Sequence, residues 1–148
     1  MNRKLNTFPL LAVLVAMLVL GLAGGVARHA FAADDENPLH VAMEKMDDAL
    51  KALRKQVGDA SQNDASLKLI DEMQAQCVVA KAMVPERAAK EADKKKFVTA
   101  YRLEMLKVMD ELVKLERAVV EGKNEEALAL AKGLTKIKNE GHEKFQVE

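Results

Sequence analysis

The sequence predicts an all-α protein folded as an antiparallel, up-down-up-down four-helix bundle. Across residues 33–148, apolar side chains recur at spacings of three and four, the period of an amphipathic helix. The same residues show no strand-like alternation of apolar and polar side chains, and β-branched residues are few beside Ala, Leu, Met, Lys and Glu. The connections predicted at residues 58–63 and 122–124 are short, so successive helices must run in opposite directions.

Residues 1–32 have the pattern of a secretory signal peptide. Arg3 and Lys4 precede an uncharged apolar run at residues 8–25, and Ala30-Phe31-Ala32 forms a small-x-small cleavage site. An uncleaved membrane anchor is the alternative, because the apolar run approaches the roughly 20 residues that span a bilayer. We expect cleavage before Ala33, since the chain turns polar there, and therefore a periplasmic protein without a membrane segment.

Charge and cysteine content narrow the possible partners. The chain has 23 basic and 23 acidic residues, and the predicted signal peptide removes three basic residues and no acidic one. The remaining chain is mildly acidic and lacks the cationic surface expected of a nucleic-acid-binding protein. Cys77 is the only cysteine, which excludes an intrachain disulfide and a multi-cysteine zinc site. We interpret it as a buried, apolar residue, with a functional thiol as the alternative.

The first two helices are predicted at residues 38–57 and 64–83. Asn37-Pro38 is a typical helix start and Gly58 a typical end. Asn63 or Asp64 can cap the second helix, which Pro85 ends. The predicted core stripes consist of Leu39, Met43, Met46, Leu50, Leu53 and Val57 in the first helix, and of Leu67, Ile70, Met73, Cys77, Ala80 and Val84 in the second.

The last two helices are predicted at residues 97–121 and 125–145. Gly122 suits the end of the third helix and Asn124 the cap of the fourth. The third helix carries its core stripe at Phe97, Tyr101, Met105, Val108, Leu112, Leu115 and Val119. Residues 85–96 are expected to form a crossing loop, with Lys94-Lys95-Lys96 as a solvated charged segment.

The predicted topology places two metal-ligand side chains at the same end of the bundle. Met43 lies near the start of the first helix and His142 near the end of the last. A thioether and a neutral imidazole on facing helices can complete six-coordinate haem iron. Each residue also has an ordinary interpretation, because methionine often fills cores and histidine often pairs with a helix C-terminus. Periodicity alone does not decide between these interpretations.

Residues near both ends of the predicted bundle resemble a known family. Ala42-Met43-Glu44, Asp48 and Leu50-Lys51 are similar to the first helix of soluble cytochrome b562. The last helix of that family is matched by Glu121-Gly122-Lys123, Glu126-Ala127, Leu134, Asn139 and His142-Glu143-Lys144-Phe145. The match is poor over residues 60–96. The resemblance implies a periplasmic electron carrier, not an enzyme, that binds one haem through Met43 and His142.

The resemblance also implies a haem pocket that includes Met46, Tyr101, Met105 and Lys138. Lys138 and Gly141 depart from the arginine and tyrosine of the best-known member, and Lys138 can pair with a haem propionate only as a point charge. Covalent attachment needs Cys-x-x-Cys-His, and positions 138 and 141 are not cysteines. The expected cofactor is therefore one noncovalent haem b.

The sequence leaves open alternatives to the ligand pair and to the electron-carrier function. His40, one turn before Met43, is a rival ligand in a bis-histidine site, while His29 leaves with the signal peptide. A haem-free periplasmic bundle that acts as an interaction or stress-related module is the second hypothesis, motivated by Lys138 and Gly141. An enzyme has little support, because the chain has no metal-spaced His/carboxylate cluster, nucleophile motif or glycine-rich phosphate loop. We expect a monomer, with redox partner proteins that the sequence does not identify.

Overall fold

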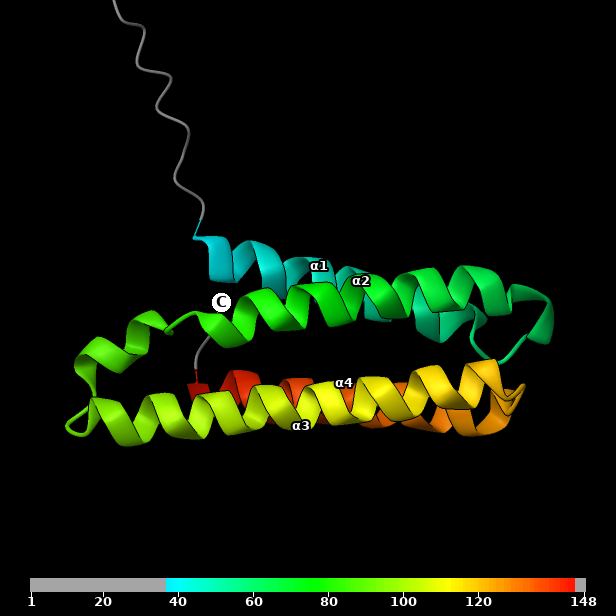
Figure 1. Ribbon diagram of the computed structural model, residues 1–148. Helices are drawn as coiled ribbons and strands as arrows, with labels where there is room; N and C mark the ends of the chain where they lie inside the picture. The colour runs from blue at the N-terminus through cyan, green and yellow to red at the C-terminus, as the bar shows by residue number, and fades with distance from the viewer. Residues whose placement is uncertain (1–36, 146–148) are drawn as a thin grey trace, which may run out of the picture. The chain divides into compact units, whose positions relative to one another are not determined.

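A computed structural model describes residues 37–145 and contains four helices, which Figure 1 shows as two antiparallel pairs. They are α1 (Pro38–Gln56), α2 (Asn63–Ala82), α3 (Lys94–Val120) and α4 (Asn124–Phe145). Two short 3₁₀ segments, η1 (Ala60–Gln62) and η2 (Glu86–Lys90), lie in the connections, and no strand occurs within residues 37–145. The predicted all-α four-helix bundle is confirmed. The predicted signal peptide lies outside the described residues, and none of the helices described is long and apolar enough to cross a membrane.

Helix boundaries follow the capping residues. Asn37 Oδ1 accepts a hydrogen bond from the Leu39 backbone N–H at 2.9 Å, and Pro38 occupies the first position of α1. The start of α3 was predicted wrongly at residue 97. The Asp93 side chain accepts from the Lys96 backbone N–H at 2.9 Å, so α3 begins at Lys94. Lys94-Lys95-Lys96 therefore forms the exposed first turn of α3 and is not part of the crossing loop.

The second helix differs from its prediction at both ends. Its N-cap position is Gln62, which makes no side-chain capping bond, and the preceding η1 is capped instead by Asp59. The helix ends at Ala82, before Val84, which was expected in the core stripe but is 50% exposed. Pro85 prevents the helical hydrogen bonds from continuing, and so Val84 leaves the helical register.

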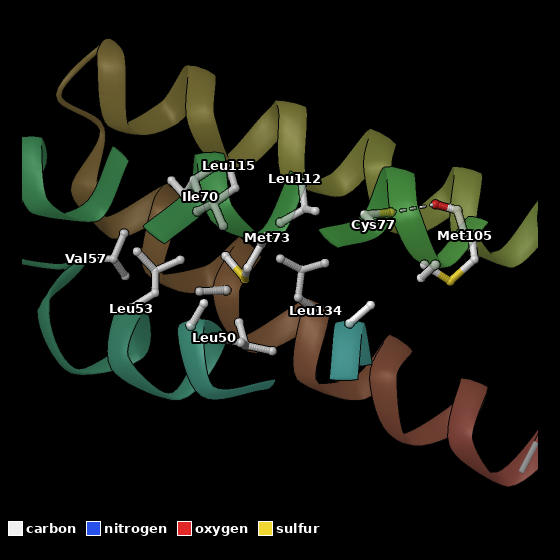
Figure 2. Packing of buried hydrophobic residues seen from close by; sticks show 14 of the residues in the cluster. Leu50, Leu53, Val57, Ile70, Met73, Cys77, Met105, Leu112, Leu115 and Leu134 are labelled. Atoms are coloured by element: carbon white, nitrogen blue, oxygen red, sulfur yellow. Dashed lines mark hydrogen bonds between the residues drawn. The ribbon is translucent and has the colours of Figure 1, made fainter. Parts of the chain in front are cut away.

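The core follows the predicted stripes. Figure 2 shows side chains from all four helices meeting along the bundle axis. The fully buried residues include Leu53, Ile70, Met73, Leu112 and Leu115. Burying a leucine or isoleucine side chain stabilises a fold by about 1.5–3 kcal/mol, so this layer holds α1, α2 and α3 together, and the buried Leu134 joins α4 to it. Met43 and Met46 are only partly buried and pack at the edge of the core.

Asparagine side chains link the helices by hydrogen bonds at one end of the bundle. This is the end where the two tight connections lie. The Asn124 amide donates to the Val57 carbonyl at 2.9 Å and to Asn63 Oδ1 at 2.7 Å. The Asn63 amide donates in turn to the Val119 carbonyl at 3.3 Å. Gly122 adopts a left-handed φ of 71°, which closes the turn between α3 and α4. These contacts fix the register of all four helices at this end.

Aromatic residues fill the opposite end, where α1 begins and α4 finishes. The Phe145 ring packs edge-to-face against Phe97 and Tyr101, with ring centroids 5.5 Å apart in both pairs. The Tyr101 hydroxyl donates to the Ala80 carbonyl at 3.0 Å, near the end of α2. The contact between α1 and α4 is the least extensive among adjacent helices. Space for a ligand is therefore most easily made between these two helices.

Candidate functional site

One pocket is lined by side chains from all four helices. It encloses about 690 Å³ of space without protein atoms, part of which is open solvent. The space within it that water can occupy is about 80 Å³, well below the roughly 300–1,000 Å³ typical of cofactor sites, so a cofactor requires the lining side chains to move apart. Its wall is mostly apolar and is formed by Met43, Met46, Asp47, Leu50, Met73, Tyr101, Glu104, Met105, Val108, Leu112, Leu134, Ile137, Lys138, Gly141, His142 and Phe145.

Both predicted ligand residues line this pocket. Met43 reaches it from α1 as a half-buried side chain, and His142 reaches it from α4, where it is exposed. The antiparallel topology brings them to one pocket although nearly the whole described chain separates them. A soft thioether and an imidazole within an apolar wall are the donor set that suits haem iron. The residue types present are therefore compatible with a haem site.

All four residues predicted for the remainder of the pocket also line it. Met46 follows Met43 by about one turn of α1, and Tyr101 and Met105 are buried neighbours on α3. Lys138 enters from α4. Burial raises the pKa of the Tyr101 hydroxyl, and a smaller contribution from Cys77 acts in the same direction. Tyr101 therefore stays protonated and provides a neutral aromatic wall.

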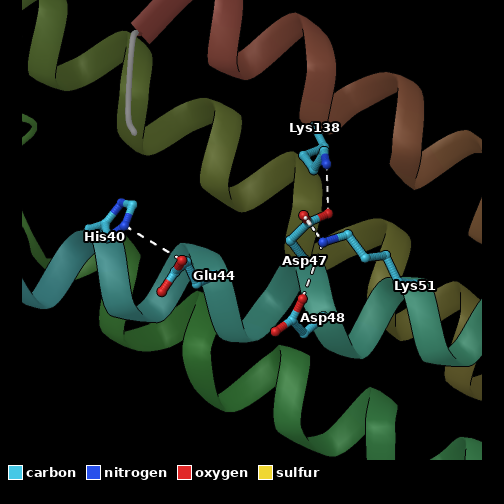
Figure 3. Close-up of polar contacts among 6 residues, drawn as sticks. All are labelled: His40, Glu44, Asp47, Asp48, Lys51 and Lys138. Atoms are coloured by element: carbon cyan, nitrogen blue, oxygen red, sulfur yellow. Dashed lines mark hydrogen bonds and ion pairs between the residues drawn. The ribbon is translucent and has the colours of Figure 1, made fainter.

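The rival ligand His40 lies apart from the pocket wall. Its Nε2 is 3.7 Å from a carboxylate oxygen of Glu44, one turn further along α1, as Figure 3 shows. His40 does not belong to the residues that line the pocket described above. This placement favours Met43 over His40 as the ligand-type side chain that α1 contributes.

An ion-pair network crosses from α1 to α4 at the pocket. Lys138 Nζ lies 2.6 Å from Asp47 Oδ1, and Lys51 Nζ lies 2.9 Å from Asp47 Oδ2. Figure 3 shows both lysines converging on the one carboxylate. Partial burial acts to raise the pKa of Asp47, but hydrogen bonds and charge from Lys138 and Lys51 outweigh it and hold the pKa below its usual value. Asp47 is thus ionised at neutral pH.

Ten of the sixteen lining residues were not predicted as site residues, and spacing from the predicted ligands could have identified Asp47 and Phe145 among them. Asp47 lies four residues after Met43 and Phe145 lies three residues after His142, so each shares a helix face with a predicted ligand. Glu104 is different, because its place depends on how α3 packs. Its carboxylate lies 3.3 Å from Lys107 Nζ and 3.8 Å from Lys144 Nζ.

Cys77 is a buried core residue that does not line the pocket. Its thiol donates to the Met105 carbonyl at 3.4 Å. Burial raises the pKa of the thiol to about 11, although Lys81 acts in the opposite direction. The thiolate is the reactive form of cysteine, and it is scarce at neutral pH. The apolar interpretation of Cys77 agrees with these observations.

The fold and the pocket together define a class, a four-helix bundle with an apolar pocket lined by methionine and histidine side chains among others. The family model for cytochrome b562 matches residues 38–146, which is most of the chain. The chain therefore belongs to the cytochrome b562 family, a family of haem-binding electron-transfer proteins that are not enzymes. No curated protein and no solved structure matches the chain.

Proposed function

We propose that this chain is a periplasmic electron carrier that binds one noncovalent haem b through Met43 and His142. The observation that carries the proposal is that a thioether from α1 and an imidazole from α4 line the same apolar pocket. Family membership supports the cofactor class. The absence of cysteine at positions 138 and 141 supports noncovalent binding. The predicted signal peptide supports periplasmic export.

The bound haem would supply reversible one-electron chemistry at its iron. Met43 and His142 would hold the iron and so leave it without a free position for oxygen or peroxide. The methionine ligand would raise the reduction potential, and the apolar wall, including Leu134 and Met105, would exclude water and act in the same direction. Exposure of His142 places its side of the pocket near the surface, where electrons can pass to a partner protein.

The second candidate is a haem-free periplasmic bundle that acts as an interaction or stress-related module. One observation favours it: Lys138, the lysine that lines the pocket, is already paired with Asp47. A ligand with carboxylates would have to displace this contact. The second candidate therefore predicts that the purified protein binds no porphyrin.

A haemin titration separates the two candidates. Haemin is added to purified apo-protein that comprises residues 33–148, and the Soret band is followed to saturation. We expect one equivalent of haemin to give a sharp band typical of six-coordinate, low-spin iron. Absence of a saturable band would support the haem-free module and refute the electron carrier.

Variants of the same protein test the two ligands. Met43→Ala and His142→Ala are each expected to lose the six-coordinate spectrum and to weaken haemin binding by at least tenfold. Met109→Ala and His40→Ala are the matched controls, because they remove the same side-chain types at positions that do not line the pocket. We expect both controls to keep the wild-type spectrum. A spectrum that depends on His40 would instead indicate bis-histidine ligation.

A further inference from the structure

The ion pair between Asp47 and Lys138 joins α1 and α4, two of the four helices that line the pocket. Its 2.6 Å contact connects α1 to α4, the adjacent pair with the least extensive packing. Both side chains also line the pocket, and they are 25% and 30% exposed. We call this pair, Asp47 and Lys138, the α1–α4 latch. A ligand that enters between α1 and α4 must pass it or displace it.

The charges around the pocket are unfavourable for an anionic ligand while the latch is closed. Two carboxylates, Asp47 and Glu104, line the pocket together with one lysine, Lys138. Glu104 has cations of its own in Lys107 and Lys144. Lys138 is therefore the ammonium group of the pocket wall that could meet a ligand carboxylate, and Asp47 occupies it.

Asp47 would not be left without a partner if Lys138 moved away. Lys51 Nζ lies 2.9 Å from its second oxygen and belongs to the same helix, so Asp47 would keep a cation. A lysine side chain has a long flexible stem and a compact charge, which allows Lys138 to change partner without moving α4. Because two lysines contact Asp47, the loss of the contact with Lys138 costs little free energy.

We propose that Lys138 exchanges partners, pairing with Asp47 in the empty protein and with a carboxylate of the porphyrin in the loaded protein. The inference rests on the proposed haem function for the identity of the ligand. Asp47 is then a competitor that sets ligand affinity, and Lys51 is the residue that keeps Asp47 neutralised when the α1–α4 latch is open.

The test measures the affinity of the apo-protein for haemin and for metal-free protoporphyrin IX, which has the same two carboxylates but no iron. Asp47→Asn should bind both ligands about three to ten times more tightly, because a partly buried ion pair of this kind no longer competes. Lys51→Gln should weaken binding, because Asp47 then holds Lys138 more firmly. Asp71→Asn is the matched control, since Asp71 is exposed, does not line the pocket and contacts neither Lys51 nor Lys138. It should leave both affinities unchanged.

The double variant Asp47→Asn/Lys138→Gln distinguishes exchange from general repulsion. If Lys138 exchanges partners, Asp47→Asn should not change the affinity for either porphyrin once Lys138 is Gln. It should also not change the affinity for the dimethyl ester of protoporphyrin IX, whose esterified carboxyl groups carry no charge. A gain of the same size in either experiment would overturn the proposal, because it would show a plain effect of the Asp47 charge.

Different results would refute the haem assignment and the partner exchange of Lys138. If haemin gives no six-coordinate spectrum but metal-free protoporphyrin shows the expected pattern, the partner exchange stands and the ligand assignment fails. If haemin binds through Met43 and His142 while Asp47→Asn is silent with both porphyrins, the exchange is refuted and the electron-carrier proposal stands.

Discussion

Of the two asparagines in α4, Asn124 and Asn139, replacement of Asn124 by Ala should destabilise the bundle more. The side chain is 9% exposed and donates to the Val57 carbonyl and to Asn63 Oδ1. Leaving a buried acceptor without a donor costs about 1–3 kcal/mol. Val57 is fully buried, whereas Asn63 is half-buried and can recruit water. We therefore expect a total loss of about 2–3 kcal/mol in the free energy of unfolding.

Urea unfolding of the apo-protein, followed by circular dichroism, measures this loss. At the slope of about 1–3 kcal/mol/M typical of small domains, the midpoint should fall by roughly 0.7–3 M with no change in slope. Asn139→Ala is the control, because Asn139 is exposed on the same helix, and it should stay within about 0.5 kcal/mol of wild type. If Asn124→Ala also stayed within that margin, the asparagine contacts would not be what fastens this end.

Three further predictions concern glycine, cysteine and pH. Gly133→Ala should raise the free energy of unfolding by up to about 1 kcal/mol in a thermal melt, because an added Cβ meets no atom within 4 Å and alanine favours helix; a loss would mean that this site is not open. Cys77 in native protein at pH 8 should resist iodoacetamide and should react once urea unfolds the chain, as mass spectrometry will show, whereas rapid native labelling would contradict its burial. The folded pKa of Asp47 is depressed, so the stability that Asp47 adds over Asp47→Asn should be present above pH 4 and decrease as the pH falls further. A difference in stability that is the same at pH 7 and pH 2 would exclude the ion pair as its source.

The fold was predictable because its signals are local and agree with one another. Asn37-Pro38 and Gly122 mark helix ends by their own backbone preferences, and the apolar stripes give the buried faces. The error at the start of α3 has a similarly local cause. Asp93 is a good N-cap, but the lysine triplet that follows it resembles a solvated loop, and only the Lys96 backbone contact decides between them.

The sequence predicted which ligand-type side chains share one pocket, but not the polar contacts at that pocket. Topology alone brings Met43 and His142 to one end, and family resemblance adds the cofactor. The pairing of Lys138 with Asp47 could not be read from the sequence, because it depends on the rotation of α1 and α4 about their axes. Lys51 was an equally good sequence partner for Asp47 at a spacing of four residues, and the structure shows that both lysines contact it.

The most direct test of the ligand assignment is iron X-ray absorption of the haemin-loaded protein. The fine structure should contain one sulfur scatterer in the first coordination shell, which disappears in Met43→Ala and remains in Met46→Ala. Only nitrogen and oxygen scatterers in the wild-type protein, or a sulfur signal that survives Met43→Ala, would contradict the assignment of Met43 as the axial partner of His142.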